Sequence, residues 1–296
     1  GGAVQGPRES AAGAALSGHI PPMPVMPSTH TPRSRSDAPL VFITGASSGI
    51  GQALALRFAQ AGYRLALVAR RAREMQAWAD ARAFDATECR VYGADVADTD
   101  SIAAAGQACL AEQGVPDVVI ANAGISVGMD TCERADIDVM ARTFATNNTG
   151  LAATFHPFLT AMATRGSGVL VGIASVAAIR GLPGHGAYCA SKAAVVAYCE
   201  SLRGELRSSG VAVVTLLPGY VDTPLTRQNR YSMPFLLSAE TFADRAFNAI
   251  RARSSYRVIP WQMGVVAKLL RLLPNALFDR LLSGRPRKHR QGEGRT

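Results

Sequence analysis

Short runs of apolar residues alternate with longer helical patterns from residue 39 onward. The runs are continuous rather than interrupted by polar positions, which is typical of parallel strands covered on both faces. They span residues 39–45, 64–70, 90–96, 117–124, 168–175 and 211–219. The segments between them are long enough for crossover helices, as in residues 192–210. The pattern predicts an α/β fold in which helices cover both faces of a doubly wound parallel sheet, in a single domain.

The two ends of the chain differ from this central part. Residues 1–38 are rich in Pro, Gly, Ser and Ala without periodicity, which predicts a disordered leader. We expect the α/β domain over residues 39–258, a C-terminal amphipathic helical extension over 259–284, and a basic tail over 285–296. Within the extension, Pro274 is expected to break or restart the helix.

The net charge of +9 lies mostly in the tails. Residues 1–36 carry +2 and residues 285–296 carry +4, which leaves +3 for the 248 residues between them. Since most of the positive charge is in the tails, the charge is better explained by a tail that is solvated or contacts a membrane than by a nucleic-acid-binding face. No nucleic-acid partner is therefore expected.

Cysteine usage and hydropathy indicate the compartment. The chain has five cysteines and no C-x-x-C arrangement, which is typical of reduced thiols in a cytoplasmic protein. No stretch has the roughly 18 uncharged apolar residues that a membrane-spanning helix needs. The sequence predicts a cytoplasmic protein without a metal site.

A glycine-rich segment follows the first predicted strand directly. Gly45, Gly49 and Gly51 stand in TGASSGIG, where the strand turns into a helix. Glycine suits these positions because a Cβ would block a pyrophosphate from the backbone amides or forbid the dihedral angles of the turn. The segment predicts a dinucleotide site, and a glycine-rich turn without a ligand is the alternative.

The end of the second predicted strand bears on which dinucleotide binds. An acidic residue there would hold a ribose hydroxyl and favour NAD, but Ala69 occupies that position and Arg70 follows it. Arg70 can bind a 2′-phosphate through two hydrogen bonds, which predicts NADP(H) as the cofactor. Arg71 and Arg73 are better interpreted as the start of a solvated helix.

Tyr188 and Lys192 are the candidate catalytic pair. They stand four residues apart, so on a helix they share one face. A phenol has a pKa of about 10, too high for proton exchange near neutrality. A Lys ammonium about 5 Å away would lower that pKa by about two units at an effective dielectric near 20, while burial would oppose the shift. A buried tyrosine beside a chance surface lysine is the alternative.

Together these motifs resemble the short-chain dehydrogenase/reductase family in its single-domain form, essentially over residues 39–225. The segments similar to family motifs are TGASSGIG at 44–51, ADV at 94–96, ANAG at 121–124, NNTG at 147–150 and PGYVDT at 218–223. Ser175 precedes Tyr188 by 13 residues, which is the family's usual spacing. The sequence departs from the family pattern at Ala121, where the family usually has Asn.

The resemblance implies a Rossmann-like sheet and a role for four catalytic residues. Tyr188 exchanges a proton with the substrate oxygen, while Lys192 lowers its pKa and holds the nicotinamide ribose. Ser175 hydrogen-bonds the carbonyl group, and Asn147 holds a water that links Lys192 to solvent. The coenzyme is expected to contact Tyr188, Lys192 and the following residues: Gly45, Ser47, Ser48, Gly49, Ile50, Gly51, Arg70, Asp95, Val96, Asn122, Ala123, Gly124, Pro218, Gly219, Val221 and Thr223. The resemblance also implies a homodimer or homotetramer formed through the helices that bear Asn147 and Tyr188.

The expected function is an NADP-dependent oxidoreductase that interconverts a ketone or aldehyde and an alcohol by hydride transfer, working as a carbonyl reductase on a lipophilic small molecule. An NAD-dependent alcohol dehydrogenase is one alternative. A nucleotide-binding or membrane-peripheral protein without turnover is another, from a different class.

Three features bear on the substrate side of the site. The apolar residues 233–237 predict either a lipophilic lid or plain packing, with equal weight. His185 is expected at the polar surface more than in contact with substrate. For the extension, packing within the subunit or a dimer is favoured over a position in a membrane interface.

Overall fold

The computed structural model describes residues 1–3, 38–227, 229, 232–284, 288 and 290. Almost all of the predicted leader and most of the basic tail lie outside the described residues. All the helices and strands below lie in the compact unit Ser34–Thr296.

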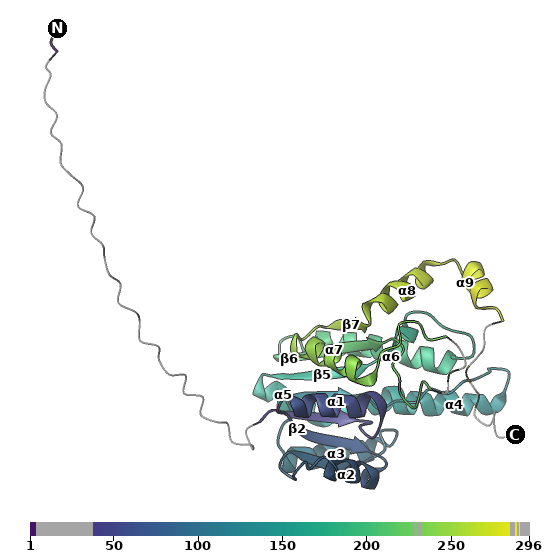
Figure 1. Cartoon of the computed structure of the whole chain (residues 1–296), viewed down its shortest axis with the longest axis horizontal. Coiled ribbons are helices and arrows are strands. Elements are labelled where there is room, and N and C mark those ends of the chain that lie inside the picture. Colours follow the sequence, from purple (N-terminus) through teal and green to yellow (C-terminus); the bar gives the residue numbers. More distant parts are fainter. Residues whose placement is uncertain (4–37, 228, 230–231, 285–287, 289, 291–296) are drawn as a thin grey trace. The chain divides into compact units, whose positions relative to one another are not determined.

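The described part of the chain forms a parallel sheet of seven strands in the order β3-β2-β1-β4-β5-β6-β7 (Figure 1). The strands are β1 (Leu40–Thr44), β2 (Arg64–Ala69), β3 (Cys89–Gly93), β4 (Val118–Ala121), β5 (Gly168–Ile173), β6 (Val211–Pro218) and β7 (Tyr256–Ile259). The predicted doubly wound α/β fold is confirmed, and six of the strands fall where continuous apolar runs occur.

Helices cover both faces of the sheet and bury a hydrophobic cluster on each. One face carries α1 (Gly49–Gln60), α2 (Ala72–Asp80) and α7 (Ala239–Arg251), and the other carries α3 (Thr99–Glu112), α5 (Gly150–Arg165) and α6 (Gly186–Glu205). Central strands are buried along their whole length because neighbouring residues point to opposite, equally covered faces. For example, Phe42 of β1 packs edge-to-face on Phe158 of α5, with ring centroids 4.8 Å apart.

Strand β7 was not predicted from the sequence. It is an edge strand of four residues paired only to β6, and Tyr256 and Arg257 are exposed. A strand with so few buried positions has no continuous apolar run, which is the pattern used to find the other six.

The extension forms two helices, α8 (Trp261–Leu272) and α9 (Asn275–Leu282). Pro274 stands between them, as expected from its missing amide donor. Helix α8 packs against β7 and against the short 3₁₀ helix η3 (Val176–Ala178) through a buried face that includes Met263 and Ala267. The packing of this face lies within the subunit.

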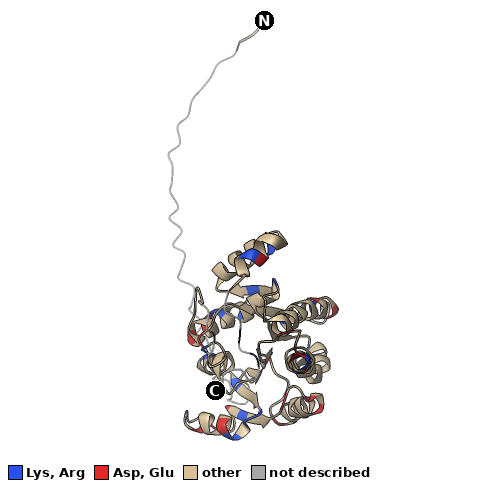
Figure 2. Ribbon diagram, turned by 90° about the vertical axis from the view of Figure 1, so that its right-hand side faces the viewer, with Lys and Arg blue, Asp and Glu red and all other residues tan. Residues whose placement is uncertain are grey.

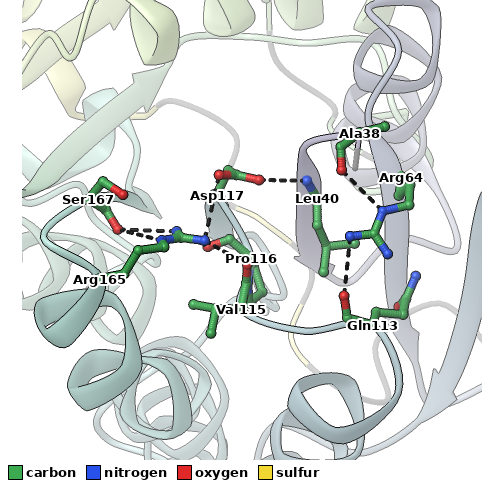
Figure 3. Close-up of polar contacts among 9 residues, drawn as sticks. All are labelled: Ala38, Leu40, Arg64, Gln113, Val115, Pro116, Asp117, Arg165 and Ser167. Carbon is green, nitrogen blue, oxygen red and sulfur yellow. Dashed lines mark hydrogen bonds and ion pairs between the residues drawn. The ribbon is translucent and has the colours of Figure 1, made fainter. Parts of the chain in front are cut away.

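The amino-terminal edge of the sheet is held by polar contacts (Figure 3). Asp117 accepts a hydrogen bond from the Leu40 amide at 2.8 Å and pairs with the Arg165 guanidinium at 3.6 Å. Arg165 also donates to the carbonyl oxygens of Val115 and Pro116 at 2.8 and 2.6 Å. These bonds tie β1, β4 and α5 together at the edge opposite the strand ends where ligands of such sheets bind.

Charged residues of both signs are distributed around the outer helices of the described part (Figure 2). No helix among the described residues is long and apolar enough to cross a membrane.

Candidate functional site

The carboxyl ends of the strands border a cavity of about 640 Å³. It lies where the strand order reverses between β1 and β4, the usual ligand position in doubly wound sheets. Most of the predicted site residues line it: Gly45, Ser47, Ser48, Gly49, Ile50, Arg70, Asp95, Val96, Asn122, Ala123, Gly124, Ser175, Tyr188, Lys192, Pro218, Gly219, Val221 and Thr223. The fold therefore gathers motifs spread over some 180 residues around one hollow, and only Gly51 and Asn147 lie outside its lining.

The glycine turn after β1 is shaped by contacts that leave no room for side chains. Gly45 has φ +66°, and a Cβ there would stand 2.8 Å from the Ala123 Cα. A Cβ on Gly51 would stand 2.6 Å from Asn122 Nδ2 and closer still to the Gly45 carbonyl oxygen. Gly51 thus lets α1 approach the turn closely, while Gly45 supplies the left-handed backbone.

Asn122 and Thr44 hold this turn against the end of β4. The Asn122 side chain donates to the carbonyl oxygens of Thr44 and Gly45 at 3.0 and 3.2 Å. The Thr44 hydroxyl oxygen accepts from the Asn122 and Ala123 amides at 3.1 and 3.3 Å. Thr44 is buried, and although it begins the motif TGASSGIG, no role was assigned to it from the sequence.

Arg70 and Asp95 face each other across the far end of the cavity. Their charged groups are 3.9 Å apart, and their side chains are 71% and 44% exposed. An exposed pair of this kind contributes little to stability, on the order of 0–1 kcal/mol. The Arg70 guanidinium therefore remains accessible to an anion.

The cavity fits the dinucleotide that the sequence predicts. A tight glycine turn at the N-terminal end of α1 suits a pyrophosphate. Arg70 and Asp95 mark the opposite side, and Tyr188 and Lys192 stand beyond the end of β5. All of these residues line the same cavity.

Ser175, Tyr188 and Lys192 meet at the inner end of the cavity. Lys192 Nζ lies 5.9 Å from the centre of the Tyr188 ring and donates to the Ile173 carbonyl oxygen at 2.8 Å. Ser175 caps η3 by accepting from the Ala177 amide at 3.2 Å, and its side chain also hydrogen-bonds Tyr188. Lys192 is 5% exposed and Ser175 is 8% exposed, so both polar groups are removed from bulk water.

The pKa of Tyr188 does not follow the sequence expectation. Burial raises it above its ordinary value of 10.0, and the hydrogen bond from Ser175 opposes this rise only in part. Burial also lowers the pKa of Lys192 to about 8. Both shifts favour the neutral forms, and desolvation is the largest cause of each.

Asn147 lies behind the cavity in a π-helical turn, η2 (Ala145–Thr149), between α4 (Arg134–Phe144) and α5. Its side chain accepts from the Ile125 amide at 2.9 Å and donates to the Ile125 carbonyl and the Ser191 hydroxyl at 3.0 and 2.9 Å. These bonds join the loop after β4 to α6, one residue before Lys192. A Cβ on Gly124 would stand 3.2 Å from Asn147 Oδ1 and 3.4 Å from Lys192 Nζ, so this glycine leaves the two groups close together.

A second cavity of about 210 Å³ adjoins the first at Ser175 and Tyr188. Its outer wall comes from the extension and is mostly apolar: Met263, Val266, Ala267, Leu270, Phe278 and Leu282. Gly219 borders both cavities, and a Cβ on it would stand 2.8 Å from the Met263 side chain. The extension therefore packs directly on the turn that follows β6.

The structure corrects the expectation for His185 and bears on the one for residues 233–237. His185 is 8% exposed and lines the second cavity, so it does not lie at the polar surface. Of the two alternatives for residues 233–237, a lid or plain packing, neither is confirmed, because none of these residues lines that cavity among the described residues and Phe235 and Leu236 are exposed. The helices α8 and α9 supply its outer wall, and periodicity alone could not reveal where they dock.

Two residues of the basic tail are packed instead of solvated. Lys288 lines the second cavity and donates to the Ser126 hydroxyl at 2.9 Å. Arg290 pairs with the Asp136 carboxylate at 2.6 Å, and that carboxylate side chain is 5% exposed. The sequence predicted a single basic tail and did not indicate the contacts with Ser126 and Asp136.

Arg180 is a further residue that the sequence analysis missed. Its guanidinium donates to the carbonyl oxygens of Leu270 and Leu273 and lies 3.7 Å from the centre of the Phe278 ring. It also donates to Asn275 Oδ1 at 3.1 Å. Arg180 thus joins the loop after η3 to the end of α8 and to α9.

Comparison with known proteins agrees with this architecture. Residues 39–233 match the short chain dehydrogenase family. An uncharacterized oxidoreductase of Myxococcus xanthus is 38% identical over 237 residues, which make up 80% of this chain and 93% of that protein. A short chain dehydrogenase/reductase from Burkholderia phymatum, solved in complex with NAD, superposes with a TM-score of 0.72 at 26% identity, over 86% of this chain and 98% of that one. A short-chain dehydrogenase from Sphingobium yanoikuyae in complex with NADPH gives a TM-score of 0.67 at 28% identity, over 80% and 97%. The chain therefore belongs to the short-chain dehydrogenase/reductase family and is an oxidoreductase.

Proposed function

We propose that this oxidoreductase is an NADP-dependent carbonyl reductase, which interconverts a lipophilic ketone or aldehyde and the corresponding alcohol. The observation that carries the proposal is the position of Ser175 and Tyr188 on the shared wall of the two cavities. A dinucleotide in the larger cavity and a small apolar molecule in the smaller one would meet at these two hydroxyl groups.

The larger cavity supports a nicotinamide dinucleotide, and Arg70 supports its 2′-phosphorylated form. Related structures are solved with NAD in one case and NADPH in another, so the relatives do not select between them. In this chain the residue at the end of β2 is Ala69, which offers no carboxylate to a ribose hydroxyl, and the next is the exposed Arg70. A guanidinium beside a phosphate provides charge and a bidentate hydrogen-bonding geometry.

The protein's own groups handle the proton. The bound dinucleotide supplies the hydride. Tyr188 donates its phenolic proton to the carbonyl oxygen, and the Ser175 hydroxyl hydrogen-bonds the same oxygen. Lys192 is cationic below its pKa of about 8 and stabilises the phenolate that remains. Asn147 positions the segment that bears Lys192, and its expected water link to solvent stays a prediction.

Replacing Tyr188 with Phe tests this proposal. Removing one oxygen atom should lower kcat by about 10²–10⁴-fold, the usual contribution of a general acid, and should leave the Kd for NADPH nearly unchanged. Turnover is followed as NADPH oxidation with a panel of lipophilic ketones and aldehydes. Tyr198→Phe, on the exposed side of the same helix, is the matched control and should retain wild-type kcat.

Retained turnover in the Tyr188→Phe variant would overturn the assigned proton donor. Tight dinucleotide binding without turnover of any panel member would favour the non-catalytic alternative. Faster alcohol oxidation with NAD than with NADP would favour the alternative of an NAD-dependent alcohol dehydrogenase.

The outer surface suggests how the protein associates. Ile137 on α4 and Tyr198 on α6 are exposed, which supports a homo-oligomer formed through these helices.

The outward face of α8 exposes Trp261, Leu269 and Leu272, at 68%, 60% and 79%. This face supports peripheral membrane contact, and a Leu269→Glu substitution that left liposome sedimentation unchanged would refute that contact.

A further inference from the structure

The second cavity contains an ammonium group in mostly apolar surroundings. Lys288 lines the cavity, where its Nζ donates to the Ser126 hydroxyl at 2.9 Å. An ammonium has three donors, and no other hydrogen bond from this one is observed among the described residues. No Asp or Glu is among the described residues that line the cavity. The cationic group is therefore placed beside the substrate space without a protein carboxylate facing it there.

The other cationic or titratable groups of this cavity have different roles. Arg180 uses its guanidinium to hold the ends of α8 and α9, through the Leu270 and Leu273 carbonyl oxygens and Asn275 Oδ1. Burial lowers the pKa of His185 from 6.5, so its ring is neutral near pH 7. Lys288 is thus the group in the described cavity that is suited to an anion.

The position of Lys288 is fixed by Arg290, two residues further on. Arg290 pairs with Asp136 at 2.6 Å and with Glu133 at 3.7 Å, and its backbone forms a parallel bridge with Gly128. Asp136 also accepts from the Asp130 amide at 2.8 Å. Arg290 is therefore anchored to α4 and to the loop before it, and Lys288 is held where it meets the cavity.

Keeping the Lys288 ammonium away from water costs free energy when no ligand supplies a counter-charge. Desolvation lowers the pKa of Lys288 to about 8, because an ammonium out of water favours its neutral form. Buried charges in proteins are normally paired, and perturbed groups in clefts are enriched at functional sites. A carboxylate brought by a ligand would supply the missing counter-charge.

We propose that Lys288 binds the carboxylate of the substrate, and that the enzyme acts on small keto acids, or the matching hydroxy acids, whose carbonyl carbon lies at Ser175 and Tyr188. The proposal rests on the proposed function of this site. The aliphatic part of the substrate would contact Val266, Leu270 and Phe278 between the two polar ends. A single ammonium beside one hydroxyl suits a monoanionic carboxylate, whereas a phosphate is better matched by an arginine fork or several cations.

The cavity volume limits the length of this substrate. About 210 Å³ is the space of about seven water molecules and lies below the range of drug-sized sites. Suitable probes are therefore 5-oxohexanoate, 7-oxooctanoate and 9-oxodecanoate, each assayed beside its methyl ester. The ester keeps the shape of the acid and removes the charge.

The test compares kcat/KM for each acid and ester in four proteins: wild type, Lys288→Met, Lys288→Arg and the control Lys268→Met. Wild type should prefer the acid by tenfold or more at one chain length. Lys288→Met should lower that preference at least tenfold, whereas Lys288→Arg should retain most of it. Lys268 is exposed on α8, so its replacement should leave the preference unchanged. Equal effects of Lys288→Met on acid and ester, or a preference for the ester at every length, would overturn the proposal.

A binding measurement separates this proposal from the proposed function. Calorimetric titration of each acid in the presence of NADP⁺, which cannot reduce a ketone, measures Kd without turnover. If wild type turns over none of the probes, the carbonyl reductase proposal fails for them, but at least tenfold tighter binding of an acid to wild type than to Lys288→Met still supports the carboxylate site. Equal binding of every acid to both proteins overturns it.

Discussion

Replacing Arg70 with Ala should change the coenzyme preference. The guanidinium is 71% exposed and 3.9 Å from the Asp95 carboxylate at the edge of the larger cavity. Because the group is largely hydrated, an effective dielectric near that of water applies, and two unit charges about 4 Å apart then interact with about 1 kcal/mol. A dianionic 2′-phosphate would therefore lose about 2 kcal/mol of attraction, which corresponds to about a 30-fold weaker Kd for NADPH.

Asp95 adds to this effect in the variant. Without Arg70, the Asp95 carboxylate would face the phosphate with no cation beside it. The Kd for NADPH should therefore rise by at least about 30-fold. NADH has no 2′-phosphate, so its Kd should change by less than about threefold. The increase in the Kd for NADPH should also shrink at high ionic strength, because exposed charges are screened.

Fluorescence titration with NADPH and NADH in parallel measures both constants. Arg73→Ala is the matched control, since Arg73 is exposed on α2 and does not line the cavity. Equal weakening of both coenzymes, or no change for NADPH, would refute the reasoning. Equal or tighter NADH binding by wild type would mean that Arg70 is a surface residue, and the screen would then turn to alcohol oxidation.

Two further predictions concern stability and pH. Arg165→Ala removes the bonds to Val115, Pro116 and Asp117 at the amino-terminal edge of the sheet. The free energy of unfolding should fall by about 2 kcal/mol, which lowers Tm by about 4–8 °C in calorimetry. The kcat should not change, because the site lies at the other edge, and an unchanged Tm would contradict this role of Arg165. The Lys288 ammonium is present below its pKa of about 8 and lost above it, so the kcat/KM ratio of acid to ester should fall between pH 7 and 9. His185 is already neutral in this range, so a ratio that stays flat in wild type, or falls equally in Lys288→Arg, would exclude the amine as the titrating group.

The central sheet was predictable because each of its inner strands is covered on both faces. Full burial leaves a continuous apolar run in the sequence, as in β1, β4 and β5, whereas the edge strand β3 is only partly buried and was found from residues 90–96. The strand β7 lies at the edge, where exposed Tyr256 and Arg257 break the run. Strand β3 lies at the other edge and was still found, so the two exposed residues that begin β7, rather than its edge position, explain the omission.

The site residues predicted from the sequence lie within short local motifs. Tyr188 and Lys192 share a helical turn, and Gly45 and Gly51 share the turn into α1. Lys288 reaches the cavity only through contacts between distant segments, which leave no local pattern. The pKa of Tyr188 was misjudged for a related reason, since the extent of burial depends on tertiary packing.

The wall shared by the two cavities has a consequence for how specificity can be altered. Ser175, Tyr188 and Lys192 are fixed by the sheet and α6, whereas much of the outer wall of the substrate space comes from α8, α9 and Lys288. A change in that outer wall can reshape the space without displacing the groups that move the proton. Exchanging residues 261–290 for the matching segment of a relative is therefore a direct route to redesigning which carbonyl compound this scaffold accepts, and the same separation would let natural variation diversify substrates on a constant chemical centre.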